Sequence, residues 1–126
     1  MAAVAAPAVA QAPLAAGGEV YTAVCAECHA TGKDKAPKFG DRKDWASRIR
    51  EGQATLTAEG WVGVRAMPPR GGRADLELEP FARAVAHMAR AAGATWQDPD
   101  ARMLERIRTA EKRLIAKQGK AKTPAR

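Results

Sequence analysis

Cysteine and histidine are scarce in this chain. Its 126 residues include two cysteines, Cys25 and Cys28, and two histidines, His29 and His87. Both cysteines stand in one short cluster, which leaves none for a disulfide that would tie distant parts of the chain together. A structural zinc site takes four ligands, and beyond this cluster the chain offers only His87, so such a site is disfavoured.

Long apolar runs and aromatic side chains are also lacking. No apolar stretch approaches the roughly 20 residues that span a bilayer, so no transmembrane helix is expected. The apolar fraction is 46%, but much of it is alanine, and aromatic residues make up only 5%. A chain of this length has room for one small domain plus tails. Its side chains alone are short of the volume that a core needs.

Acidic residues are few at the C-terminal end. The formal net charge is +7; residues 1–99 hold 12 Lys or Arg against 11 Asp or Glu, whereas residues 100–126 hold 9 against 3. The basic character therefore belongs to the C-terminal segment. Nucleic-acid binding is not expected, because these basic residues have no interleaved aromatic side chains.

The central motif is Cys25-Ala26-Glu27-Cys28-His29. With this spacing two thiols add across the two vinyl groups of a haem while the histidine turns its ring toward the iron, so the motif indicates one covalently attached c-type haem. A thioredoxin-like redox pair is the rival interpretation, but it needs alternating strands and helices, which the sequence does not have. A buried porphyrin would also supply the missing core volume.

Met67 is the candidate for a second iron ligand. It stands in residues 66–72, AMPPRGG, where two successive prolines remove backbone donors and force an extended course. Such a segment holds Met67 in a fixed direction, and a thioether is a soft ligand that suits haem iron. A methionine in a small protein more often packs in the core. The prolines and the upstream motif nevertheless favour the ligand role.

Apolar periodicity and helix end signals predict three short helices before the Met67 segment. The first begins at Gly17 or Gly18 and delivers the motif, and polar residues 31–38 then form a loop. Asp41 is the expected N-cap of a second helix that closes near Gly52. A third helix starts at Thr55 or Thr57 and runs toward residue 64.

The two tryptophans of these helices have two interpretations. Trp45 and Trp61 either fill the core, or pack an indole on the haem edge and donate its N–H to a propionate.

A fourth helix is predicted over residues 78–91, where Phe81, Val85 and Met88 repeat at helical spacing and mark the buried face. Pro80 is acceptable because it lies in the first turn, and Gly93 supplies the stop. His87 falls off this stripe, which favours a boundary position for it over a role as iron ligand.

The C-terminal segment predicts a fifth, amphipathic helix with Asp98 as N-cap, Pro99 as its first residue and Gly119 at its end. Two hypotheses stay open for it. The helix packs its apolar stripe on its own domain and leaves a solvated basic face, or it docks in a partner's groove or on an anionic membrane. Residues 1–16, rich in alanine and proline, are interpreted as a disordered segment or a signal remnant.

Taken together, the motifs resemble a class I cytochrome c, and most closely the small bacterial cytochrome c5 group. The similarity covers about residues 17–92, although the further cysteine pair of many c5-like proteins is missing here. It rests on Gly17-x-x-x-Tyr21 before Cys25-x-x-Cys28-His29, on Ala36-Pro37-Lys38-Phe39-Gly40-Asp41, on Trp45 with Arg48-Ile49, and on Met67-Pro68-Pro69-Arg70-Gly71-Gly72.

The resemblance implies an all-α fold of about four short helices around one haem c, over residues 17–93. Residues 94–126 lie outside the resemblance and are expected, from their own pattern, to form a basic helical extension. It also implies that Cys25 and Cys28 form the thioethers and that His29 and Met67 are the axial ligands.

The other carried-over positions lie around these ligands. A backbone carbonyl near Pro37 would accept from the second His29 nitrogen. Trp45 and Arg48 match positions near the propionates, and Tyr21 should meet the helix at 78–91.

The expected function is one-electron transfer, since two axial ligands leave no open site on the iron. Expected partners are a redox donor and a redox acceptor with acidic docking surfaces, with an anionic membrane as a further candidate. A periplasmic, soluble or peripherally attached monomer is expected, because thioether haem is assembled outside the cytoplasm. Two alternatives remain: a haem subunit of a larger respiratory oxidoreductase docked through its C-terminal helix, and a haem enzyme or gas sensor.

Overall fold

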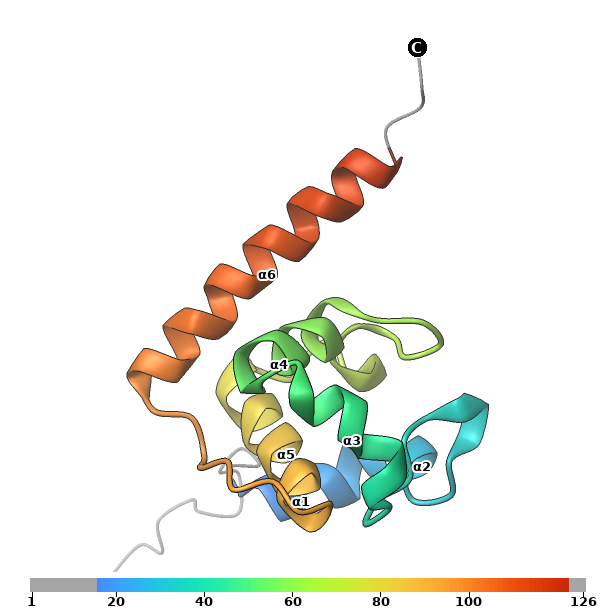
Figure 1. Cartoon of the computed structure of the whole chain (residues 1–126). Coiled ribbons are helices and arrows are strands. Elements are labelled where there is room, and N and C mark those ends of the chain that lie inside the picture. The colour runs from blue at the N-terminus through green and yellow to red at the C-terminus, as the bar shows by residue number, and fades with distance from the viewer. Residues whose placement is uncertain (1–15, 123–126) are drawn as a thin grey trace, which may run out of the picture.

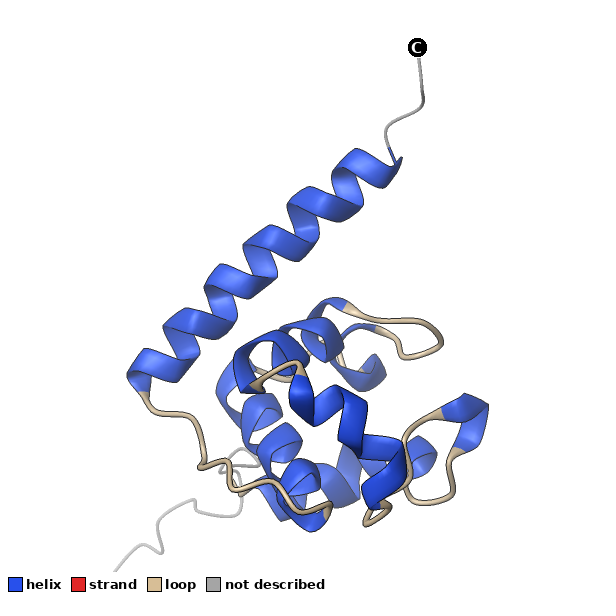
Figure 2. Cartoon of the chain, viewed as in Figure 1, coloured by secondary structure: helices blue, strands red, loops and turns tan. Residues whose placement is uncertain are grey.

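The computed structural model describes residues 16–122, and the interpretations of residues 1–15 and 123–126 lie outside this range. The described residues form helices and turns without a strand, apart from one isolated bridge between Val64 and Met67 (Figures 1 and 2). The elements in order are α1 (Gly17–Val20), the π-helical turn η2 (Tyr21–Cys25), α2 (Ala26–His29), the 3₁₀ turn η3 (Lys33–Lys35), α3 (Arg42–Arg50), α4 (Gln53–Val62), the 3₁₀ turn η4 (Pro69–Gly72), α5 (Leu78–Ala91) and α6 (Ala101–Lys122).

The first predicted helix is continuous in space but contains a π turn. α1, η2 and α2 follow one another without a break, and the Ala26 amide donates to the Tyr21 carbonyl across five residues. π turns inside α-helices are rare and are frequent at functional sites. This one ends at Cys25, the first residue of the motif.

The N-terminal helix crosses α5 at very close range. A Cβ atom on Gly17 would collide with the Arg83 carbonyl oxygen, so only glycine permits this approach. One turn later the Tyr21 ring lies 5.7 Å from the His87 ring, centroid to centroid. The expected meeting of Tyr21 with this helix is therefore confirmed.

α5 has the predicted bounds and the predicted buried face. Phe81, Val85, Met88 and Ala92 are all buried, and the helix ends before Gly93, whose φ is +102°. His87 is half-buried at the edge of this face, against the Tyr21 and Phe39 rings. Its predicted boundary position is confirmed.

Glycines at positive φ set the ends of α3 and α4. Asp41 caps α3 by accepting from the Asp44 amide at 3.0 Å, as predicted. Gly52 has a φ of +97° and Gly63 a φ of +103°, conformations that side chains other than glycine rarely adopt. α4 therefore begins at Gln53, two residues before the earliest predicted start, and ends at Val62.

The ends of α6 differ from the prediction. Asp100, not Asp98, is the cap, since its Oδ1 accepts from the Met103 amide at 2.8 Å. The Asp98 carboxylate instead pairs with Arg90 at 3.1 Å. The helix also continues through Gly119 to Lys122, because a glycine in a solvated helix costs only about 1 kcal/mol relative to alanine and does not force a stop.

α6 packs on its own domain, which was one of the two hypotheses for it (Figure 1). Ile107 is fully buried and Met103, Leu104 and Leu114 contact the core. The main contact is with α4. The basic side chains of the helix between Arg102 and Lys117 are exposed.

Candidate functional site

The two cysteines lie at the end of the N-terminal helix, three residues apart and therefore on neighbouring positions of one helical face. Cys25 is only 4% exposed and Cys28 is half-buried, and both thiols are free. Burial, together with the charge of Cys28, raises the pKa of the Cys25 thiol to about 12. Redox-active pairs need a lowered thiol pKa, so the environment is the opposite of a thioredoxin-like site.

His29 follows directly and has a fixed ring. Its side chain is 6% exposed, and its Nδ1 lies 2.8 Å from the Pro37 carbonyl oxygen. Burial lowers the pKa of His29, with a smaller contribution from the Arg48 charge, although the bond to Pro37 opposes the shift. A neutral ring that donates from Nδ1 keeps the lone pair on Nε2 available as a ligand. The expected acceptor near Pro37 is present.

The loop after α2 is fastened to the motif. The Phe39 amide donates to the His29 carbonyl at 2.7 Å, and the Trp45 indole N–H donates to the Lys38 carbonyl at 2.9 Å. These bonds hold Pro37 where it meets the imidazole. From the sequence, Phe39 was named only as part of the motif from Ala36 to Asp41 and was given no role, because a single aromatic residue in a polar loop gives no periodic signal.

Met67 lies in a tight turn over α4. Paired backbone hydrogen bonds of 3.1 and 2.8 Å join it to Val64. A Cβ atom on Gly60 would lie 3.6 Å from the Met67 sulfur and 3.0 Å from the Phe81 ring. Glycine at position 60 thus leaves the room that the thioether occupies. The sequence pattern did not reveal this role, since Gly60 stands inside an ordinary helical stretch.

The segment after Met67 is less extended than predicted. Pro68 is extended, with a φ of −70° and a ψ of 159°, but residues 69–72 form the 3₁₀ turn η4. Arg70 and Gly71 reach positive φ values of 57° and 67° there. The two prolines fix only their own φ angles, so the chain is free to turn directly after them.

Trp45 and Arg48 lie beside His29. The Trp45 ring is 3% exposed and its centroid is 5.7 Å from that of the His29 ring. Because its N–H already donates to Lys38, the structure favours the core interpretation of Trp45 over a bond to a propionate. The Arg48 guanidinium donates to the Asp44 carbonyl at 2.9 Å, and its charge acts on His29.

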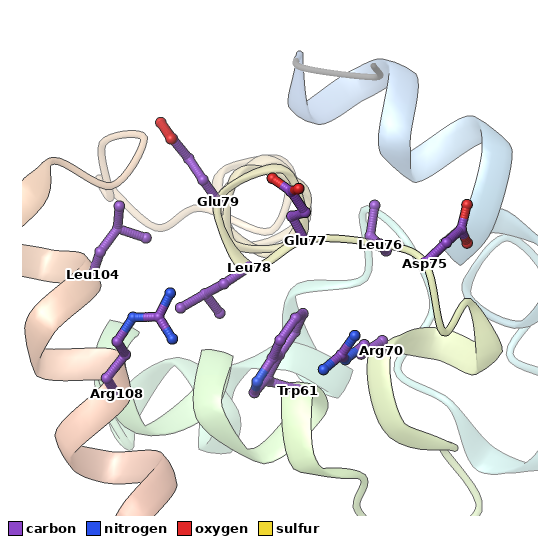
Figure 3. Close-up of a pocket in the computed structure, with 9 residues that line it drawn as sticks. All are labelled: Trp61, Arg70, Asp75, Leu76, Glu77, Leu78, Glu79, Leu104 and Arg108. Carbon is purple, nitrogen blue, oxygen red and sulfur yellow. The ribbon is translucent and has the colours of Figure 1, made fainter.

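Trp61 also donates its indole N–H to a protein group, the Glu111 carboxylate of α6. Arg70 lies over its ring with the Cζ atom 4.1 Å from the centroid. Both side chains line a cavity of about 410 Å³ that also receives Leu104 and Arg108 from α6 (Figure 3). Apart from Trp61, for which a place at the haem edge was one of two interpretations, none of the residues predicted to bind haem lines this cavity.

One buried hydroxyl has no hydrogen-bond partner within the described residues. Thr57 on α4 is fully buried, and its Oγ1 is unsatisfied, which is costly unless another group meets it. Sequence reasoning treated Thr57 only as a possible helix start.

The donor set fits a covalently attached haem. Cys25 and Cys28 are free thiols and have the sequence spacing of c-type haem attachment. The His29 ring has its orientation fixed by one nitrogen, and Met67 supplies a thioether from a constrained turn. These residues offer both the attachment points and two ligand types of haem iron.

A family model described as "Cytochrome C oxidase, cbb3-type, subunit III" matches residues 12–88. The chain belongs to this family of c-type cytochromes. Cytochrome c-555 of Chlorobaculum tepidum is 45% identical over 78 residues, which cover 59% of this chain and 72% of that protein. Cytochrome c5 of Azotobacter vinelandii is 36% identical over 75 residues, which cover 58% of this chain and 90% of that protein.

A solved cytochrome c has the same fold. The crystal structure of an electron transfer complex of nitrite reductase with cytochrome c contains a chain that is 42% identical, with a TM-score of 0.58. The match covers 60% of this chain and 93% of that chain. The predicted class I cytochrome c fold and the resemblance to the c5 group are thus confirmed.

This cytochrome carries covalently bound haem c and serves as a haem-based electron carrier rather than an enzyme. Within residues 16–122, no helix has the length and apolar character to cross a membrane. The family match ends at residue 88, so α6 lies outside the part that the family model matches.

Proposed function

We propose that this cytochrome is a one-electron carrier whose haem is attached through Cys25 and Cys28 and ligated by His29 and Met67. The observation that carries the proposal is the hydrogen bond between His29 Nδ1 and the Pro37 carbonyl. It fixes the ring orientation and the tautomer, as second-shell partners of ligating histidines do. Nε2 is then the ring nitrogen that would bind the iron.

When bound, the haem supplies an iron that accepts and releases one electron without a change of ligands. His29 and Met67 would hold the iron from the protein and would leave no ligand position for a substrate. The Met67 thioether favours the ferrous state relative to a second histidine, which raises the reduction potential. Cys25, His29 and Trp45 are buried, so little solvent would have to reorganise around these residues during transfer.

The partners that we propose are redox proteins, one donor and one acceptor, with acidic docking surfaces. A related cytochrome c is found in complex with nitrite reductase, which supports protein partners of this kind. We place the carrier in the periplasm, within a respiratory chain, because thioether haem is assembled outside the cytoplasm. We propose a position near the propionates for Arg48 and for the Trp45 ring on the family resemblance alone. The Trp45 N–H, which donates to Lys38, makes no bond to a propionate in this proposal.

The test is the absorption spectrum of the ferric holoprotein. The weak sulfur-to-iron band of a low-spin His/Met haem should be present in the wild type and absent in Met67→Ala. Met103→Ala is the matched control, since Met103 lies on α6 and should leave the band unchanged. Survival of the band in Met67→Ala would refute the ligand assignment.

A second function, a haem subunit of a larger oxidoreductase, is favoured by the oxidase subunit in the family description. Packing of the α6 apolar face on α4 supports a freestanding carrier instead. Deletion of residues 98–126 distinguishes the two. A large fall in the thermal midpoint supports the carrier, and unchanged stability with loss of partner binding supports the subunit.

A further inference from the structure

Four basic residues form one line along α6. Arg102, Arg106, Arg113 and Lys117 differ by 4, 7 and 4 positions, so at 100° per residue they fall within about 60° of one another around the helix. All four are exposed. The line extends over about 22 Å at the usual rise per residue. We call these four residues the cationic stripe.

The charge of the cationic stripe is not neutralised inside the molecule. None of its residues makes an ion pair with the residues that the structure describes. The acidic Glu111 of the same helix is turned inward and accepts from Trp61. The opposite flank of α6 has acidic residues close to its basic ones, because Arg108 lines a cavity together with Asp75, Glu77 and Glu79 (Figure 3).

The apolar face of α6 is not free to enter a membrane. Ile107 is fully buried, and the apolar residues around it contact the core. Ile115 is the one large apolar side chain of the described helix that is prominently exposed, at 52%. Interfacial helices bind lipid by burying a whole apolar face, so a charged protein surface suits this helix better than a bilayer.

The stripe leads toward the loop that carries Met67. It ends at Lys117, and the next residue, Gln118, lines a hollow of about 430 Å³ together with residues 62–69. Gln118 is turned by about 100° from Lys117 toward the packed face of α6, so the Met67 turn adjoins the Lys117 end of the stripe. A protein that contacts this end of the stripe would lie near the Met67 turn. Electron transfer becomes faster as the donor and the haem come closer.

We propose that the cationic stripe is the docking surface for an acidic redox protein and guides it to the Met67 side of the cytochrome. This inference rests on the proposed electron-carrier function and adds that the extension outside the family match recognises the partner. One electron passes from the reduced partner to the ferric iron, or from the ferrous iron to the oxidised partner, and no bond is formed or broken.

The test compares two charge reversals on one helix. Arg106→Glu/Arg113→Glu alters the stripe, and Arg108→Glu/Lys112→Glu makes the same charge change on the opposite flank. Reduced flavodoxin, an acidic one-electron donor, is mixed with each ferric holoprotein at low and high salt. We expect the first variant to lose about tenfold or more in rate constant at low salt, with a flatter salt dependence. The second should lose much less.

One control and two contrary outcomes make the result decisive. Reduction by the small donor hydroquinone, with unchanged ligand bands, should be equal in all proteins. If both variants react with flavodoxin at the wild-type rate, or if both lose the same factor in rate, the inference is overturned. An intact His/Met spectrum in these proteins would still leave the proposed function standing. Phosphatidylglycerol vesicles test the membrane alternative. If the wild type binds them, the stripe variant alone does not, and the flavodoxin kinetics are unaltered, the partner of the stripe is a membrane and not a protein.

Discussion

The indole N–H of Trp61 donates to the Glu111 carboxylate across 3.0 Å and so joins α4 to α6. The two residues are 50 positions apart in sequence. Trp61 also packs on Phe81 with ring centroids 5.6 Å apart and lies under Arg70 of η4. This one contact ties the C-terminal helix to the core and to the turn that follows Met67.

We predict that Glu111→Ala lowers the free energy of unfolding by about 1–3 kcal/mol, because the indole N–H loses its acceptor where Trp61 is only 8% exposed. Glu111→Gln keeps an acceptor and should lose less. The exposed Glu105 on the same helix provides a control, and Glu105→Ala should change stability by no more than about 0.5 kcal/mol. Urea unfolding of the holoprotein measures all three. Equal stabilities of the Glu111→Ala and Glu105→Ala proteins would contradict the prediction.

The crossing of the N-terminal helix with α5 gives a second prediction. Gly17→Ala should destabilise the protein by about 1–3 kcal/mol, because the new methyl group collides with the Arg83 backbone and forces the helices apart. Gly18→Ala is the matched control. Its methyl would meet the His87 ring at an ordinary 3.5 Å, so stability should stay the same or rise slightly. Thermal midpoints that fall equally in the two variants would show that the close approach is not responsible.

Glu59 on α4 makes stability depend on pH. Burial, and after it the hydrogen bond and charge of Glu51, raise the pKa of the Glu59 carboxyl from 4.5 to about 7. The folded state therefore holds a proton that the unfolded state has released at pH 5 to 7. The contribution of Glu59 to stability is complete below pH 4.5 and is lost as the pH rises through about 7, with a slope below about 1.4 kcal/mol per pH unit because the group is partly solvated.

The variant Glu59→Gln, which stays uncharged, checks this sign. Its stability relative to the wild type should increase between pH 5 and pH 8. The exposed Glu105→Gln should follow the wild type throughout. Urea unfolding at a series of pH values supplies the comparison, and a constant difference between Glu59→Gln and wild type would rule out the shifted carboxyl.

Local patterns predicted the helices well where a helix has its own end signals. Asp41 caps α3 as expected, and residues 78–91 form α5 with the predicted bounds. The predicted N-cap of α6 was wrong, because Asp98 and Asp100 are both residues of a type that caps helices. A long-range ion pair with Arg90 occupies Asp98 and leaves Asp100 for the helix. Sequence periodicity does not contain that contact.

The sequence predicted the residues of the candidate site, but it did not predict the neighbouring residues that hold them in place. The motif from Cys25 to His29 and the turn of Met67 are local, and so is the hydrogen bond to Pro37, eight residues from His29. The supporting features at Gly60 and Thr57 depend on which atoms face them across helices. The partners of the two indole N–H groups are likewise set by packing.

The sequence by itself determined the covalent haem, the two ligand candidates and the concentration of positive charge after residue 100, because each follows from residue type and short spacing. Only the tertiary structure decided how α6 is used. The sequence pattern of its apolar stripe is equally compatible with packing on its own domain, docking in a partner's groove and binding to a membrane. Burial of Ile107 and the bond between Trp61 and Glu111 select the first, because an apolar face can be covered only once.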